Sequence, residues 1–198
     1  GEKGSGVILA TAIGDQSEKD NWSGMFFEGD TDGTIYGTAV TPTDDFTIPE
    51  DTNLVIGPDQ EVVIPAGVTV TILGTAAGDM TLESGAGIQI GNGPTVQVGA
   101  DGGTVVSGPA VALPGGGSAA MTDGQGGVIT VTMPESGGTI APDDAGRLTL
   151  PAGSTIQTAN GPAITVSGEN AAVTPDGAVQ VPGGGSVIVT SGQGSTTT

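Results

Sequence analysis

Residues 47–74 read TIPEDTNLVIGPDQEVVIPAGVTVTILG and contain one short apolar phrase twice. An Ile-Pro pair followed by alternating apolar residues begins at Ile48 and returns at Ile64. Apolar residues spaced two apart and bounded by Gly, Pro, Asn or Asp are typical of half-buried β-strands. The repetition therefore predicts short strands at a regular interval, and we expect the two phrases to form the same edge of successive coils.

The pattern continues through the rest of the chain, where one apolar-x-apolar pair follows another roughly every eight residues. Examples are Met80/Leu82, Ile88/Ile90, Val96/Val98, Val111/Leu113, Leu148/Leu150, Ile164/Val166 and Val187/Val189. No apolar period of the helical kind persists, and the 38 glycines and 13 prolines disfavour helices. The sequence thus predicts an all-β fold.

A longer repeat contains these short units. Residues 71–127 align without a gap on residues 139–195, so that each residue number in the second copy is higher by 68, and 25 of the 57 aligned positions are identical. Repeats of short strands that cannot bury an apolar edge alone are typical of solenoids, in which neighbouring coils stack into one thin core. We expect a parallel β-solenoid over residues 47–190. The alternative is an antiparallel β-sandwich or meander, which Asn92-Gly93 favours as a hairpin turn and Pro94 disfavours.

Residues 1–46 differ from this body in composition. All five aromatic residues lie within residues 22–46, and more than half of the acids occur by Glu61. We expect residues 1–46 to form an acidic, aromatic cap that covers the exposed core at one end of the solenoid. Residues 191–198, SGQGSTTT, are expected to form a flexible tail, and Gly1 at the start is expected for a mature or trimmed chain.

Charge and composition exclude several classes of function. The net charge is −19, with 22 acids against 3 basic residues, so the chain lacks the cations that neutralise nucleic-acid phosphates. The absence of Cys and His removes thiolate chemistry and most zinc sites. No apolar run approaches the length of a membrane span.

Three stretches resemble known extracellular proteins. GAVQVPGGGS (177–186) resembles the Gly-rich "DGxVxxPGGGS" repeats of Gram-positive bacterial surface proteins. FTIPEDTNLVI (46–56) and VVIPAGVTVTI (62–72) resemble the "IPxGxTLTI" coils of right-handed β-helix, or pectin-lyase-like, modules. The resemblance implies a right-handed parallel β-helix in a secreted or wall-associated bacterial surface protein.

The candidate catalytic residues do not form a recognisable set, and we expect no enzymatic activity. Enzymes of the resembled fold require basic residues at the sugar. Arg147 is the only arginine here, and it aligns with Asp79 in the other copy, so a solvated turn residue is expected. The adjacent acids Asp143 and Asp144 would point to opposite faces of a strand, so they are expected to be surface charges. No histidine is present to activate a serine.

Two binding sites remain as hypotheses in the N-terminal segment. Asp30 and Asp32 alternate before Gly33 as in the start of a calcium loop, although Thr41 occupies the twelfth position, where such loops carry Glu. No cofactor other than calcium is expected. Trp22 and Tyr36 could stack on sugar rings, or lie at the rim of the cap.

These observations lead to one expected function and one alternative. We expect a non-catalytic structural or adhesive module, a surface spacer, whose partner is a surface polysaccharide or another protein. The alternative is a carbohydrate-binding module that uses the aromatic residues of segment 22–36.

Overall fold

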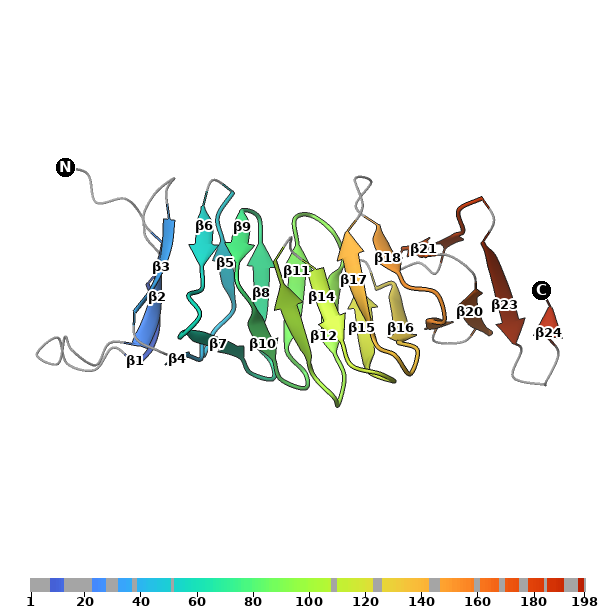
Figure 1. Cartoon of the computed structure of the whole chain (residues 1–198), viewed down its shortest axis with the longest axis horizontal. Helices are drawn as coiled ribbons and strands as arrows, with labels where there is room; N and C mark the ends of the chain where they lie inside the picture. The colour runs from blue at the N-terminus through green and yellow to red at the C-terminus, as the bar shows by residue number, and fades with distance from the viewer. Residues whose placement is uncertain are drawn as a thin grey trace, which may run out of the picture.

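All the secondary structure that the computed structural model describes is β-strand, which confirms the predicted all-β class. The described residues are 8–12, 23–27, 32–36, 39–50, 52–107, 110–122, 126–142, 147–158, 161–167, 170–174, 178–183, 185–190 and 196–197. The strands stack along one long axis, and the first and last of them lie at its opposite ends (Figure 1). The molecule is therefore elongated.

The described strands form three sheets. The five-stranded sheet has the order β1 (Ile8–Ala12), β2 (Ser23–Phe27), β3 (Asp32–Tyr36), β6 (Asn53–Val55) and β9 (Thr75–Ala77). The nine-stranded sheet has the order β4 (Ala39–Val40), β7 (Glu61–Ile64), β10 (Met80–Leu82), β13 (Gly103–Val106), β14 (Ala110–Leu113), β17 (Gly138–Pro142), β18 (Leu148–Leu150), β21 (Ala171–Val173) and β22 (Val179–Gln180). The ten-stranded sheet has the order β5 (Phe46–Ile48), β8 (Thr69–Ile72), β11 (Gly87–Ile90), β12 (Thr95–Val98), β15 (Ser118–Thr122), β16 (Val128–Thr132), β19 (Thr155–Thr158), β20 (Ala163–Ser167), β23 (Ser186–Thr190) and β24 (Thr196–Thr197).

From β4 to β11 the chain visits the nine-, ten- and five-stranded sheets in turn, and every pairing among these strands is parallel. We call residues 39–90 the parallel region. Val62 pairs with Met80 in the nine-stranded sheet, and Phe46 pairs with Val70 in the ten-stranded sheet. Each return to a sheet thus takes a full circuit of the chain, as in the predicted solenoid.

From β12 onward every pairing is antiparallel, and we call residues 95–190 the antiparallel region. The chain here places two strands in one sheet and the next two in the other. The change occurs at the hairpin of β11 and β12, whose turn runs from Ile90 to Gly93, with Gly93 N donating to Ile90 O at 3.1 Å. The turn is therefore centred on Gly91-Asn92, one residue before the predicted Asn92-Gly93 pair. Pro94 lies outside the ladder, which begins with Gln89 opposite Thr95. The sheets are therefore mixed, and the prediction of one parallel β-helix over residues 47–190 is not confirmed.

The phrase that opens residues 47–74 is a strand end followed by a turn. Ile48 ends β5 in the ten-stranded sheet, whereas Ile64 ends β7 in the nine-stranded sheet, so the prediction that they stack on one coil edge is wrong. What the two phrases share is the turn, because the carbonyl oxygens of Pro49 and Pro65 accept hydrogen bonds from the nitrogens of the residues three positions later, at 3.1 and 3.2 Å.

The same turn follows four strands of the antiparallel region. Pro114, Pro134, Pro151 and Pro182 also accept a hydrogen bond from the nitrogen three residues on. Gly67 and Gly153 occupy the third position of two such turns with φ of 82° and 88°, the left-handed conformation that a type II turn requires there. A short apolar strand that ends in proline is therefore compatible with both parallel and antiparallel chain paths.

The core is one continuous apolar cluster that extends from Val40 to Val173. Alternate residues of the strands of the two large sheets point into it, as in β18, where Leu148 and Leu150 are buried and Thr149 is half-buried on the outer face. The period of two in the sequence thus specifies which side of each strand faces the core.

The two ends of the chain differ in part from the expected cap and tail. β4 and Phe46, which fall within the predicted segment 1–46, belong to the two large sheets, and Phe46 is buried. β1, β2 and β3 extend the five-stranded sheet at the same end of the molecule. Within the expected tail, Thr196 and Thr197 form β24 and pair with β23, and the remaining tail residues lie outside the described ranges.

Candidate functional site

The predicted binding residues of the N-terminal segment are only partly described. Trp22 and Asp30 lie outside the described residues. Tyr36 and Asp32 lie at the two ends of β3, where Tyr36 is opposite Gly24 of β2 and Asp32 is beside Asn53 of β6. The carbohydrate and calcium hypotheses therefore stay predictions. In the described part of the chain, no three acidic side chains lie close enough together to hold a metal ion.

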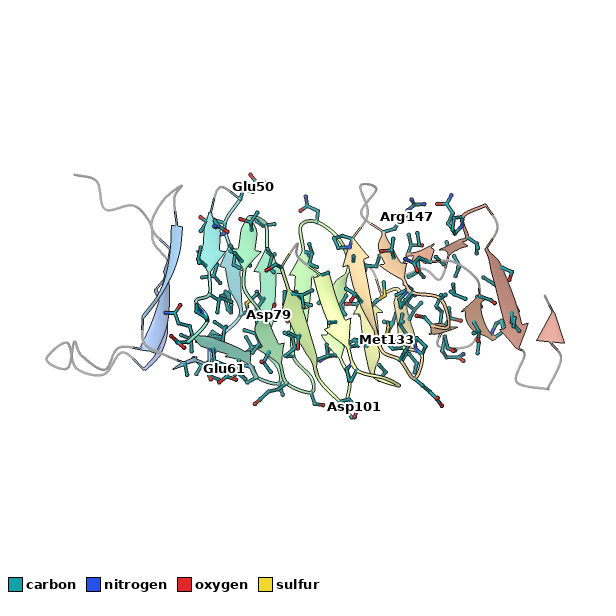
Figure 2. The ribbon with its side chains drawn as sticks, in the orientation of Figure 1. Glu50, Glu61, Asp79, Asp101, Met133 and Arg147 are labelled. Atoms are coloured by element: carbon teal, nitrogen blue, oxygen red, sulfur yellow. The ribbon has the colours of Figure 1, made fainter. Side chains whose placement is uncertain are left out.

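Charged side chains avoid the strands of the two large sheets. The strands of the ten-stranded sheet contain no charged residue, and those of the nine-stranded sheet contain only Glu61. Figure 2 shows Glu50 at one rim of the molecule and Asp101 at the other, both in turns. The pair Asp143 and Asp144 lies outside the described residues. Apart from Glu61, the outer faces of the described strands of both sheets are consequently uncharged.

Two of the depressions that the described residues form lie on the outer face of the nine-stranded sheet. The first depression, with a volume of about 480 Å³, lies on β10, β13 and β14 and has the cross-strand row Thr81–Thr104–Ala112 along it, with Asp101 and Pro114 at its margins. The second depression, of about 360 Å³, lies on β18, β21 and β22. Its row is Thr149–Ala172–Gln180. Both are open to solvent.

The two depressions are the same feature built twice. Adding 68 to the residue number converts six of the eight lining residues of the first into lining residues of the second. These pairs are Thr81/Thr149, Gly103/Ala171, Thr104/Ala172, Ala112/Gln180, Leu113/Val181 and Pro114/Pro182. The sequence duplication therefore produces a repeated surface as well as repeated strands.

Equivalent hydrogen bonds occur at two turns of both copies. Beside the depressions, Gly117 N donates to Pro114 O and Gly185 N donates to Pro182 O, both at 2.9 Å. On the other sheet, the side-chain amide of Gln89 donates to Gly93 O at 3.0 Å. Its counterpart Gln157 donates to Gly161 O at 2.7 Å. Each Gln thereby stabilises a hairpin turn, and the hairpin of β11 and β12 repeats in that of β19 and β20.

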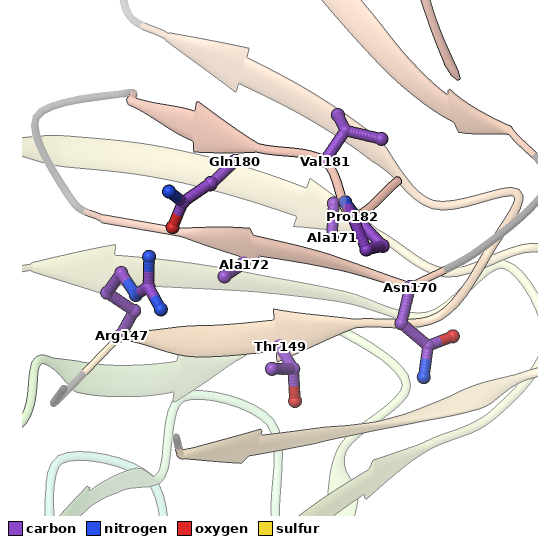
Figure 3. A pocket seen from close by; sticks show the side chains of 8 residues that line it. All are labelled: Arg147, Thr149, Asn170, Ala171, Ala172, Gln180, Val181 and Pro182. Carbon is purple, nitrogen blue, oxygen red and sulfur yellow. The ribbon is translucent and has the colours of Figure 1, made fainter. Parts of the chain in front are cut away.

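Among the described residues, a different charged group lies at the margin of each depression. The first has the exposed carboxylate of Asp101, whereas the second has the half-buried Arg147, the one cationic residue within the described ranges. Figure 3 shows Arg147 and Gln180 toward one end of the second depression and Asn170 with Pro182 toward the other. An adjoining hollow of about 350 Å³ shares Arg147 and Gln180 and lengthens the second depression. Carboxylate, guanidinium, amide and hydroxyl groups over a floor of small side chains can hydrogen-bond a polar ligand that lies flat on the sheet.

Sequence reasoning does not identify these depressions. It predicts a surface turn residue at Arg147, and the structure places this residue immediately before β18 at the margin of the second depression. The available signal is the pattern of small outward residues, such as Thr104 and Ala172, at equivalent positions of the duplication.

Comparison with known proteins adds no identification: no family model, curated protein or solved structure matches this chain. Within the ranges that the structure describes, no helix is long and apolar enough to cross a membrane.

Proposed function

We propose that the chain is a non-catalytic structural or adhesive module of a secreted or cell-surface bacterial protein, in which it acts as a stiff spacer that presents a long face to a partner. The observation that supports the proposal most directly is the stacking of strands along one axis, with β1 and β24 at its opposite ends (Figure 1). Because the first and last strands lie at opposite ends of the stack, the module would hold the parts of a protein attached at its two ends a fixed distance apart.

Two physical features support a spacer. The apolar cluster is continuous along the two large sheets, so the described part of residues 40–173 shows no break at which the stack could hinge. The net charge of −19 keeps neighbouring copies apart and soluble. A stiff, self-repelling rod suits a module that separates other parts of a surface protein.

The sequence resemblance favours the same location. The phrases at 46–56, 62–72 and 177–186 resemble bacterial surface repeats and right-handed β-helix coils. The parallel region, in which each return to a sheet takes a full circuit of the chain, is the part that we assign to a β-helix-like arrangement.

The spacer proposal is tested by a distance measurement within the chain. Because the chain contains no cysteine, Thr47→Cys and Ser186→Cys can be labelled specifically, and both positions are exposed on the ten-stranded sheet. β5 and β23 are eight strand steps apart, so single-molecule energy transfer should give one narrow distance of about 38 Å between backbones. The shorter pair Thr47→Cys and Thr130→Cys, five steps apart, should give about 24 Å.

A stiff module keeps both distances from low to high salt. A flexible chain with the same sequence separation as the longer pair would give a broad distribution centred at about 65 Å. Such a distribution, or two separate populations, would contradict the spacer proposal.

A further inference from the structure

We propose that the outer face of the nine-stranded sheet binds an uncharged polysaccharide, whose chain crosses the strands and occupies the first and second depressions together. This inference rests on the proposed function as a surface module and assigns its partner class and binding face. The site differs from the one predicted at Trp22 and Tyr36, which lie elsewhere in the sequence.

The spacing of the depressions favours a polymer. Each strand of the second depression is four strand steps along the sheet from its counterpart, as β18 is from β10, so the two depressions are about 19 Å apart. The strand between them is β17, whose outward residues are the exposed Thr139 and the half-buried Ala141. A ligand that extends across this strip meets the same row of groups twice, as a molecule with a repeating unit does.

The lining groups suit hydroxyl-rich rings. The carboxylate of Asp101 accepts hydrogen bonds, the guanidinium of Arg147 donates them from a planar fork, and the amide of Gln180 does both. The small side chains of Ala112 and Ala172 leave room for the C–H face of a sugar ring to lie against the sheet. Volumes of about 350 to 480 Å³ are at the lower end of the range for small-molecule sites, which fits sugar-sized units at each position.

The electrostatics favour a ligand without charge. A net charge of −19 repels polyanions such as polyuronates, and the strands below the depressions contain no charged residue. Among the described lining residues, Asp101 brings one negative charge to the margin of the first depression and Arg147 one positive charge to the margin of the second. A neutral glycan therefore needs no counter-charge to approach this face.

The length dependence of binding tests the two-depression arrangement. Calorimetry with the full chain would use disaccharides and hexasaccharides of β-1,4-linked glucose, N-acetylglucosamine and xylose, with a polyuronate hexasaccharide for comparison. In at least one neutral series the hexasaccharide should bind about tenfold more tightly than the disaccharide, because its second contact is intramolecular. The proposal is overturned if no neutral series binds, if length has no effect, or if the polyuronate binds as tightly.

Filling the depressions tests the location. Ala112→Leu and Ala172→Leu add bulk on the outer face of the first and second depression, and Ala120→Leu makes the same change at a half-buried outward position of the ten-stranded sheet. Each of the first two changes should lower hexasaccharide affinity about tenfold, to the disaccharide level, and the pair should abolish binding. Ala120→Leu should leave the affinity within twofold of the parent. Unchanged binding in the double variant, or equal loss in the control, contradicts the proposal.

A milder set of changes covers the case in which a leucine variant fails to fold. Asp101→Asn and Gln180→Ala alter exposed side chains at the two depressions, and each should weaken hexasaccharide binding several-fold with an unchanged circular dichroism spectrum. Parent-like affinity in both would count against the assignment.

The distance between labels at residues 47 and 186 separates the two proposals. If the protein binds no glycan but the distance between the labels stays at about 38 Å, only the glycan proposal is contradicted. A broad distance distribution removes the spacer.

Discussion

In the parallel region the chain makes a full circuit of three sheets before it returns to the same one, whereas in the antiparallel region a hairpin returns it at once. The parallel region therefore needs three sheets, and the antiparallel region continues with two. Both regions nevertheless fill one core with the same short strands. Apolar-x-apolar strands of this kind are therefore compatible with either direction of pairing.

The duplication shows this most clearly at its start. Thr71-Ile72 and Thr139-Ile140 are equivalent and identical, yet the first pair lies in β8 of the ten-stranded sheet with parallel neighbours. The second lies in β17 of the nine-stranded sheet with antiparallel neighbours. Identical residues thus occupy different sheets because the chain segments that precede them differ in path.

The largest effect is expected from removing one core side chain in each region. Ile72 and Ile140 are each 1% exposed, so Ile72→Ala and Ile140→Ala should each lower the free energy of unfolding by about 2–5 kcal/mol through lost burial and a cavity. Urea unfolding followed by circular dichroism measures both. If the two regions form one cooperative unit, each variant shifts a single transition. A variant that shifts only part of the signal would show that the regions unfold separately.

A smaller difference is expected between the two copies at one turn. A Cβ on Gly115 would overlap the carbonyl oxygen of Glu135, whereas a Cβ on its counterpart Gly183 would meet nothing within 4 Å. Gly115→Ala should therefore lower the free energy of unfolding by about 2 kcal/mol, as overpacking does, and Gly183→Ala should change it by less than about 1 kcal/mol. Thermal unfolding of both variants provides the comparison, and equal losses would mean that the copies do not differ at this turn.

The hairpin glutamines should give a still smaller effect. Gln157 donates to the carbonyl oxygens of Thr158 and Gly161, at 2.9 and 2.7 Å, and Gln89 donates to that of Gly93 at 3.0 Å. Gln157→Ala and Gln89→Ala should each cost about 0.5–1.5 kcal/mol, with the greater loss at Gln157 because it makes two bonds. If urea unfolding shows a larger loss of unfolding free energy for Gln89→Ala, the hairpin of β11 and β12 contributes more to stability than that of β19 and β20. The hairpin of β11 and β12 is the one at which strand pairing changes from parallel to antiparallel.

The smallest effect is expected from Trp22→Ala on glycan binding. If the sugar lies on the nine-stranded sheet, this change should leave hexasaccharide affinity within twofold of the parent, as measured by the same calorimetry. Loss of affinity in a folded Trp22→Ala variant would favour the site at Trp22 and Tyr36 and argue against their role in a cap.

The sequence is sufficient to predict the strands but not their directions. The pairs Met80/Leu82, Val96/Val98 and Leu148/Leu150 all lie in strands and are buried, because a period of two specifies which residues face a core. The same period does not specify whether neighbouring strands pair in parallel or antiparallel. The hairpin signal at Asn92-Gly93 is the better guide to direction, because a hairpin turn does form there, centred one residue earlier on Gly91-Asn92. Pro94 precedes the ladder and does not disrupt it. The depressions depend on which outward residues become neighbours across strands, and a strand pattern does not contain that information.

The repeat that aligns residue 71 with residue 139 has a geometric consequence for how such a protein could change in size. Equivalent strands, such as β11 and β19 or β10 and β18, are four steps apart in both large sheets, so one further copy would add about 19 Å of length and leave the cross-section unchanged. The strands near the end of each copy pair antiparallel: β15 pairs with β16, which follows it, and β23 pairs with β20, which precedes it. A further copy would join the stack by the same antiparallel pairing. The length of such a molecule therefore changes in steps of one repeat. A gene that gains or loses one repeat changes the length of the protein and leaves the packing of the core the same.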